Sequence, residues 1–148
     1  MESTPLAPGG QAAPARETAP PKILLVEDES AVRQLLKNAV LRLGYRVLAA
    51  ANSAEALAIW QQQPTEIMLL LTDLVMPGSL NGRELARELR QQQPALKVIF
   101  ISGYSFDIIA EGFSLETGVT FLAKPFKLSQ LADAIHDLLG AEKVRTRP

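Results

Sequence analysis

Short apolar runs alternate along the chain with longer segments in which apolar residues recur every three or four positions. A run of four to eight apolar residues bounded by turn residues is typical of a buried strand, and the wider spacing is typical of an amphipathic helix. The apolar runs predict strands at 22–26, 45–50, 66–72, 96–101 and 119–123. The periodic segments predict helices at 30–43, 53–63, 83–93 and 128–139, and a short helix within an irregular stretch at 106–112.

Each predicted helix is expected to bury one face. Asn52 or Ser53 caps the second helix, and Gly44, Pro64 and Pro94 end the first, second and third. The residues expected to face the core are Val32, Leu35, Leu36, Ala39, Val40 and Leu43 in the first helix, Ala54, Leu57, Ala58 and Trp60 in the second, Leu85, Ala86 and Leu89 in the third, and Leu131, Ala134, Ile135 and Leu138 in the last.

The order of elements is strand then helix, repeated five times. This alternation predicts an α/β fold with a parallel sheet covered by helices on both faces. Right-handed crossovers leave few topologies, and one of them is the doubly wound, flavodoxin-like sheet with strand order 2-1-3-4-5. We predict this five-stranded fold for the chain.

Composition divides the 148 residues into three parts. Residues 1–21 are rich in Pro, Ala and Gly and nearly lack large apolar side chains, so they cannot offset the entropy lost on ordering. We expect a disordered tail or linker at 1–21, one folded domain at 22–140 and a frayed end at 141–148. The folded part is long enough for one full hydrophobic core.

Several classes of function are disfavoured by the residue counts. The formal net charge is −1, which gives no electrostatic bias toward nucleic acid or a membrane surface. The chain has no cysteine and one histidine, His136, so thiolate and multi-histidine metal sites are excluded. His136 is interpreted as a surface residue. The absence of cysteine, of an apolar run near ~20 residues and of a signal peptide leads us to expect a cytoplasmic protein without a membrane segment.

Three acidic residues follow two of the predicted strands. Glu27 and Asp28 end the first strand, and Asp73 ends the third, which begins as the apolar run Ile67 to Leu71. In the predicted order these strands are neighbours, and ligands of open α/β sheets bind at their carboxyl ends. Converging carboxylates repel one another unless a cation intervenes, and oxygen ligands alone suit Mg²⁺ before Ca²⁺. The sequence therefore predicts a Mg²⁺ site.

Two further polar side chains are predicted at the same edge of the sheet. Ser102 ends the fourth strand, and Lys124 ends the fifth, before Pro125, where a cis peptide bond is plausible. A carboxylate nucleophile, a divalent cation, a hydroxyl and an ammonium group suit phosphoryl transfer onto Asp73.

At these residues the chain resembles the receiver domains of two-component response regulators. The resemblance covers residue 22 to about residue 140, and its marks are Glu27-Asp28, Thr72-Asp73-Leu74-Val75-Met76-Pro77-Gly78, Ser102 and Lys124-Pro125-Phe126. The loop after Asp73 and Ser102-Gly103-Tyr104 look most like single-domain receivers or the receivers that end hybrid histidine kinases.

The resemblance implies a role for each marked residue. Asp73 would accept a phosphoryl group from a histidine kinase or a histidine phosphotransfer protein. Mg²⁺ would be held by Glu27, Asp28, Asp73 and the backbone carbonyl of Val75. Ser102 and Lys124 would hold the phosphoryl group, and Ser102 and Phe121 would switch the face formed by 106–117, 119–123 and 128–139 for protein partners. The downstream partner is unknown, and no DNA-binding segment is expected on this chain.

The chain departs from the family pattern at three places. The acidic pair begins with Glu27 where aspartate is commoner, and the switch aromatic is Phe121, which has no phenol hydroxyl. The segment 106–117 is interrupted by glycine. The complete set of site residues argues against a degenerate receiver that binds partners without being phosphorylated, but Glu27 and the interrupted segment 106–117 keep this alternative open.

Two enzyme or ligand-binding alternatives fit less well. Aspartyl-phosphate hydrolases of the haloacid dehalogenase type need a second acid two residues after the nucleophile, where this chain has Val75. A flavodoxin-like nucleotide-binding module needs a glycine-rich or hydroxyl-rich loop after its first strand, where this chain has Glu27-Asp28-Glu29. We therefore expect a signalling domain that catalyses only its own phosphorylation and dephosphorylation.

Overall fold

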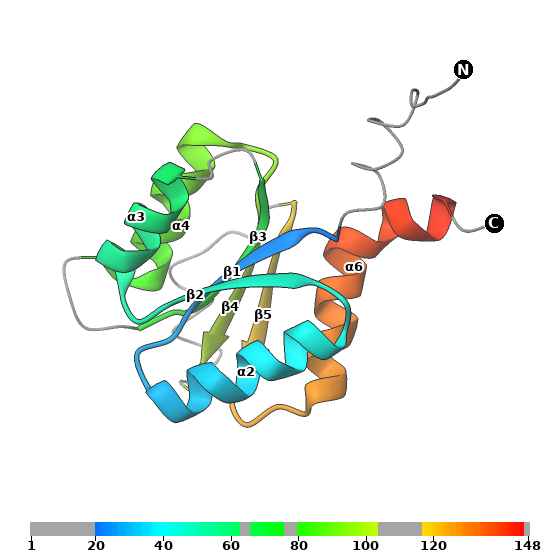
Figure 1. Ribbon diagram of the computed structural model, residues 1–148, viewed down its shortest axis with the longest axis horizontal. Helices are drawn as coiled ribbons and strands as arrows, with labels where there is room; N and C mark the ends of the chain where they lie inside the picture. The colour runs from blue at the N-terminus through cyan, green and yellow to red at the C-terminus, as the bar shows by residue number, and fades with distance from the viewer. Residues whose placement is uncertain (1–19, 63–65, 76–79, 104–116, 147–148) are drawn as a thin grey trace, which may run out of the picture.

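The computed structural model describes residues 20–62, 66–75, 80–103 and 117–146, with side chains as far as residue 140. Strands and helices alternate through this part of the chain (Figure 1). The strands are β1 (Lys22–Val26), β2 (Arg46–Ala50), β3 (Ile67–Asp73), β4 (Lys97–Ser102) and β5 (Val119–Ala123). The helices are α2 (Ser30–Arg42), α3 (Ser53–Gln62), α4 (Gly82–Gln92) and α6 (Leu128–Thr146).

The five strands form one parallel sheet in the order β2-β1-β3-β4-β5, which confirms the predicted fold. The chain moves outward from β1 to β2 and then crosses back to β3. The point where the direction reverses lies between β1 and β3, and ligands of such sheets bind at the carboxyl ends of the strands at this point. Val26 pairs with Thr72 in the register, so the residues that follow β1 lie beside Asp73.

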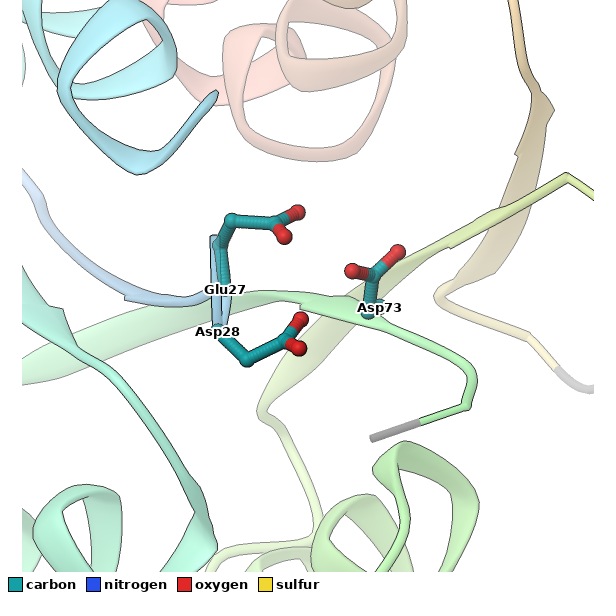
Figure 2. Close-up of side chains that lie close together, drawn as sticks. All are labelled: Glu27, Asp28 and Asp73. Carbon is teal, nitrogen blue, oxygen red and sulfur yellow. The ribbon is translucent and has the colours of Figure 1, made fainter. Parts of the chain in front are cut away.

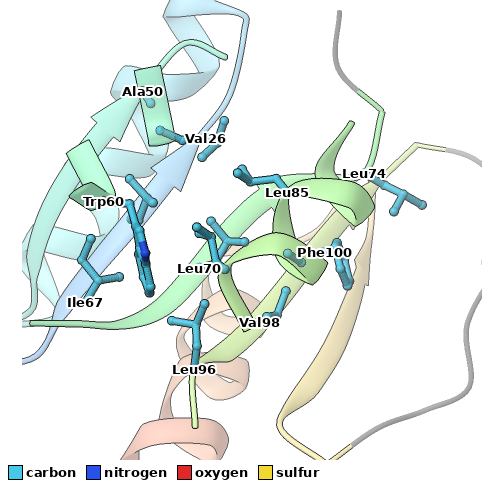
Figure 3. Close-up of a cluster of buried hydrophobic side chains, with 14 residues drawn as sticks. Val26, Ala50, Trp60, Ile67, Leu70, Leu74, Leu85, Leu96, Val98 and Phe100 are labelled. Carbon is cyan, nitrogen blue, oxygen red and sulfur yellow. The ribbon is translucent and has the colours of Figure 1, made fainter. Parts of the chain in front are cut away.

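Helices cover both faces of the sheet, α3 and α4 on one face and α2 and α6 on the other (Figure 1). Alternate strand residues point to opposite faces. In β1, Leu24 and Val26 pack toward α3 and α4, whereas Ile23 and Leu25 pack toward α2 and α6. Figure 3 shows the first of these layers. Burial on both faces explains why the strands are nearly continuous apolar runs.

Trp60 of α3 is buried in the layer between this helix, α4 and the sheet. Its indole N–H donates a hydrogen bond to Gln92 Oε1 of α4 at 2.9 Å. The large ring therefore gains apolar contacts while its polar atom has a partner. This bond ties the C-terminal ends of two helices that are consecutive along the described chain.

The predicted helical faces were partly wrong. Leu35 is 57% exposed and Leu43 is 40% exposed, because α2 buries a narrower stripe centred on Leu36 and Val40. An interval of one residue turns a helix by about 100°, so Leu35 lies well away from the stripe centred on Leu36. In α3, Ala54 and Ala58, which were expected to face the core, are exposed, whereas Ala56 and Trp60 are buried. The inward faces predicted for α4 and α6 are confirmed.

The last helix is longer than predicted. It runs to Thr146, through residues assigned to a frayed end, because Gly140 does not interrupt it and the next residues are mostly good helix formers. None of the described helices combines the length and hydrophobicity needed to cross a membrane. The predicted short helix at 106–112 and residues 1–19 of the predicted tail lie outside the described part of the chain.

Gly82, the first residue of α4, packs directly on the end of β3. A Cβ atom built on Gly82 would lie 1.9 Å from the backbone oxygen of Asp73 and 3.1 Å from the Cα of Leu74. The Gly82 N–H also donates to the carbonyl oxygen of Leu74 at 3.0 Å. Glycine is therefore required here for close approach of two backbones, and this contact sets the distance between α4 and Asp73.

We predict that Gly82→Ala destabilises the protein by about 1–3 kcal/mol, because the added methyl group overpacks the Asp73 backbone. Helix propensity alone would give the opposite sign, since alanine is favoured over glycine by about 1 kcal/mol in a helix. Urea unfolding would measure the change. Gly103→Ala is the control, since its Cβ meets no described atom within 4 Å. Equal or higher stability of Gly82→Ala would contradict the packing argument.

Candidate functional site

Three carboxylates converge at the carboxyl ends of β1 and β3. Glu27, Asp28 and Asp73 each offer an oxygen, and these oxygens lie within 4.8 Å of one another. Figure 2 shows the three side chains directed into one space. Glu27 and Asp73 are buried and Asp28 is exposed, so the group is open to solvent on the side of Asp28. The structure thus brings together the three acids predicted from the sequence.

The pKa of Glu27, one of the three acids, is clearly changed by its surroundings. Its Oε2 accepts a hydrogen bond from the Glu29 backbone N–H at 3.1 Å, whereas its buried Oε1 has no hydrogen-bond partner among the described residues. Burial raises the pKa of Glu27 to about 7, with a further contribution from its hydrogen bond and repulsion with Asp73; the Glu29 N–H and Lys124 act in the opposite direction. An ionised Glu27 is therefore costly in the folded protein.

Lys124 provides the positive charge at this cluster. Its Nζ lies 3.3 Å from Asp73 Oδ1 and 4.0 Å from Glu27 Oε1. The Lys124 backbone N–H donates to the Ser102 carbonyl oxygen at 2.8 Å, which joins the ends of β4 and β5. The Lys124-Pro125 bond is cis, as the sequence suggested. Ser102 is buried at the end of β4, beside the strand that carries Asp73.

A comparison with family models identifies this arrangement. Residues 23–136 match the response regulator receiver domain. The chain belongs to the response regulator receiver family. The matched segment contains the three acids, Ser102 and Lys124, so the site lies inside the region that defines the family. The chain is a receiver domain of two-component signalling.

Individual relatives agree with this assignment. The receiver is 42% identical to the sensor kinase CckA of Brucella abortus over 117 residues, which are 79% of this chain and 12% of that protein. It is 37% identical to the response regulator receiver protein CpdR of the same organism over 120 residues, covering 81% of this chain and 98% of CpdR. The structure of TrrA from Thermotoga maritima in complex with Mg²⁺-BeF is 30% identical, with a TM-score of 0.67, and covers 80% of this chain and 99% of TrrA.

The donor set of the receiver fits a hard divalent cation. All donors are carboxylate oxygens, which Mg²⁺ prefers to nitrogen or sulfur ligands. The buried Glu27 Oε1 accepts no hydrogen bond from any described protein group, so this oxygen can still serve as a ligand. A cation here would relieve the repulsion between Glu27 and Asp73, and it would leave the exposed side of Asp28 open to water.

Two other predicted residues lie away from the carboxylates. Phe121 of β5 is half-buried and stacks on Phe100 of β4, with ring centroids 5.4 Å apart and planes inclined by 26°. It packs on the same side of the sheet as α3 and α4. His136 is exposed on α6, as the sequence interpretation expected, and is separate from the acidic cluster.

Sequence reasoning missed three residues that support the receiver site. Arg33 of α2 donates to the Glu27 carbonyl, and Gly82 contacts the Asp73 backbone. The hydroxyl of the buried Ser53 accepts from the Leu80 N–H at 3.3 Å, which holds the chain shortly before α4. Gly82 left a signal, because glycine is a poor helix former and stands directly before the helix predicted at 83–93, whereas the sequence indicated Ser53 only as a possible helix cap.

We predict that Glu27→Gln stabilises the metal-free protein at pH 8 by about 1–3 kcal/mol. The raised pKa means that the folded protein loses stability as pH rises from about 4.5 through 7, and glutamine removes this loss. Glutamine also keeps an oxygen that can accept from the Glu29 N–H. Urea unfolding in EDTA at pH 8 and pH 5 would measure the effect, which should shrink at pH 5.

The matched control is Glu29→Gln, the same chemical change at an exposed neighbour. It should leave the free energy of unfolding within about 0.5 kcal/mol of the parent, as is usual for surface substitutions. A Glu27→Gln variant that is less stable than the parent at pH 8 would mean that the attraction to Lys124 outweighs burial and repulsion.

Proposed function

We propose that this receiver accepts a phosphoryl group on Asp73 from the phosphohistidine of a histidine kinase or a histidine phosphotransfer protein. The observation that carries the proposal is the position of the Asp73 carboxylate. It ends a central strand, lies 3.3 Å from the Lys124 ammonium group and shares one space with the other two acids. A nucleophile held at a sheet edge beside a cation suits phosphoryl transfer.

The transfer is a direct displacement at phosphorus. A carboxylate oxygen of Asp73 forms the new O–P bond while the P–N bond to the donor imidazole breaks, and the electron pair of that bond leaves with the imidazole nitrogen, which takes up a proton. Lys124 moves from its contact with Asp73 toward a phosphoryl oxygen and balances the charge that accumulates there. The Ser102 hydroxyl donates a hydrogen bond to another of these oxygens.

Glu27, Asp28, Asp73 and the backbone carbonyl of Val75 would hold Mg²⁺ at this site. When bound, the ion supplies positive charge at the phosphoryl oxygens, which three carboxylates alone would repel. Glu27 Oε1, which is buried and accepts no hydrogen bond from the described residues, supports this assignment. Glutamate in place of the commoner aspartate still offers an oxygen to the shared space.

Phosphorylation would act on protein partners through Ser102 and Phe121. Ser102 accepts from the N–H of Lys124, which directly follows β5, and Phe121 lies within β5, three residues before Lys124. A shift of Ser102 toward the phosphoryl group would therefore displace β5 and change the stacking of Phe121 against Phe100. The proposed output face comprises β5, α6 and 106–117, of which residues 106–116 lie outside the described part of the chain.

The proposed domain catalyses only its own phosphorylation and dephosphorylation, in the cytoplasm, and signals to a downstream protein. The lack of cysteine agrees with a reducing setting. A role as a single-domain receiver or as part of a hybrid histidine kinase is consistent with the likeness to CpdR and to CckA.

Incubation with Mg²⁺ and acetyl phosphate tests the proposal. Acetyl phosphate replaces the phosphohistidine donor, and acetate is then the leaving group. We predict one added phosphoryl group by intact mass in the parent, none in Asp73→Asn, and none when EDTA removes the metal. The Asn side chain keeps the size of Asp73 but is not a carboxylate nucleophile.

The matched control is Asp137→Asn, an exposed aspartate on α6. This variant should carry the adduct at the parent level. An adduct on Asp73→Asn equal to that on the parent would assign phosphorylation to another residue. No adduct on folded parent protein would favour a degenerate receiver that binds its partners without phosphorylation.

A further inference from the structure

Arg33, in the first turn of α2, reaches back over the turn that carries the acidic pair. Its guanidinium Nη1 donates to the Glu27 carbonyl oxygen at 2.7 Å and lies 3.5 Å from the Asp28 carbonyl oxygen. The first contact is a short, charge-assisted hydrogen bond, and the second is at the limit for one. Arg33 is half-buried against this turn.

The turn has few other restraints among the described residues. The Glu27 N–H donates to the Ala50 carbonyl oxygen at 3.0 Å, and the Glu29 N–H donates to the Glu27 side chain at 3.1 Å. The Glu27 carbonyl lies just beyond β1, where the ladder of the sheet has ended. Arg33 provides this carbonyl with a donor and so fixes the backbone from which both acidic side chains extend.

Arg33 contacts backbone oxygens of the acidic turn, and this choice of atoms leaves the side-chain oxygens available to a cation. Both contacts are to carbonyl oxygens, so the guanidinium orients the turn without occupying the carboxylate oxygens that a metal would use. An arginine paired with the carboxylates would compete with the metal instead. Arg33 is thus arranged as an outer support for ligands that remain available.

We infer that Arg33 is a positioning residue for the Mg²⁺ site, acting through the backbone of Glu27 and Asp28. The inference rests on the proposed function, because it presupposes that these acids hold the ion. It assigns to α2 a second role beside packing on the sheet, since the helix carries the group that orders the metal-binding turn.

Two effects of Arg33 on Mg²⁺ affinity have opposite signs. Its positive charge repels the ion, so removing the charge alone would tighten binding. Its hydrogen bond orders the ligands, so removing the donor would weaken binding. A positioning role requires the second effect to be larger, and substitutions that change charge and donor separately can distinguish the two.

Titration of the full chain with MgCl₂ by calorimetry tests the inference. Arg33→Met keeps the apolar stem and removes both charge and donors, and we predict a Kd for Mg²⁺ about tenfold weaker than that of the parent. Arg33→Lys keeps the charge and one donor group, and its Kd should fall between the two. The matched control is Arg42→Met in the last turn of the same helix, where the exposed arginine is far along α2 from the acidic turn.

A second readout separates positioning from a general structural role. The rate of phosphorylation by acetyl phosphate at saturating Mg²⁺ should be within twofold of the parent in Arg33→Met, because excess metal restores the occupied site. A variant that is simply misfolded would lose this rate at every metal concentration, and that result would overturn the inference.

The remaining outcomes are also decisive. A Kd of Arg33→Met equal to that of Arg42→Met would show that ordering by Arg33 does not exceed its charge effect, and a Kd tighter than that of the parent would show that the charge dominates. Either result would reject the positioning role. The parent protein is measured first. If the folded parent binds no Mg²⁺ and gains no phosphoryl group, the proposed function itself fails, whatever the Arg33 variants show.

Discussion

The mutual repulsion of three carboxylates is the constraint around which this receiver is built. The switch in chain direction between β1 and β3 forces Glu27, Asp28 and Asp73 into one space, and the hydrophobic layers on both faces of the sheet prevent the strands from separating to relieve it. The protein compensates with Lys124 at 3.3 Å from Asp73 and a raised pKa at Glu27. Three carboxyl groups still lie beside one lysine ammonium group, and this arrangement favours binding of a cation.

The supports of the site come from all of its surrounding elements. Arg33 of α2 holds the acidic turn, Gly82 of α4 sets the contact with the end of β3, and the Lys124 N–H joins β5 to β4. Each of these contacts involves backbone atoms, so it orients a chemical group without using the side-chain oxygens of that group. The reactive side chains therefore remain available for a ligand while their positions are fixed.

The sheet order and the gathering of the acids could be predicted because both depend on local patterns. Apolar runs identify buried strands, and the residue after each strand must lie at the carboxyl edge of the sheet, whatever the details of packing. Arg33 and Ser53 could not be predicted, since their partners are backbone groups that are identical in every sequence. The exposure of Leu35 was missed for a similar reason: periodicity indicates an apolar face, and only packing against the sheet decides how wide a stripe is covered.

β5 lies at the edge of the sheet, and this position affects how a structural change at the acidic cluster could reach the rest of the domain. Asp73 belongs to a strand with hydrogen-bonded neighbours on both sides, whereas Phe121 belongs to a strand bonded only to β4 within the described sheet, and Lys124 directly follows that strand. A displacement of β5 disturbs one ladder of backbone bonds, and the same displacement of β3 would disturb two. The sheet of the receiver therefore places Asp73 in a strand held on both sides and places Phe121 in an edge strand, whose displacement breaks fewer backbone hydrogen bonds.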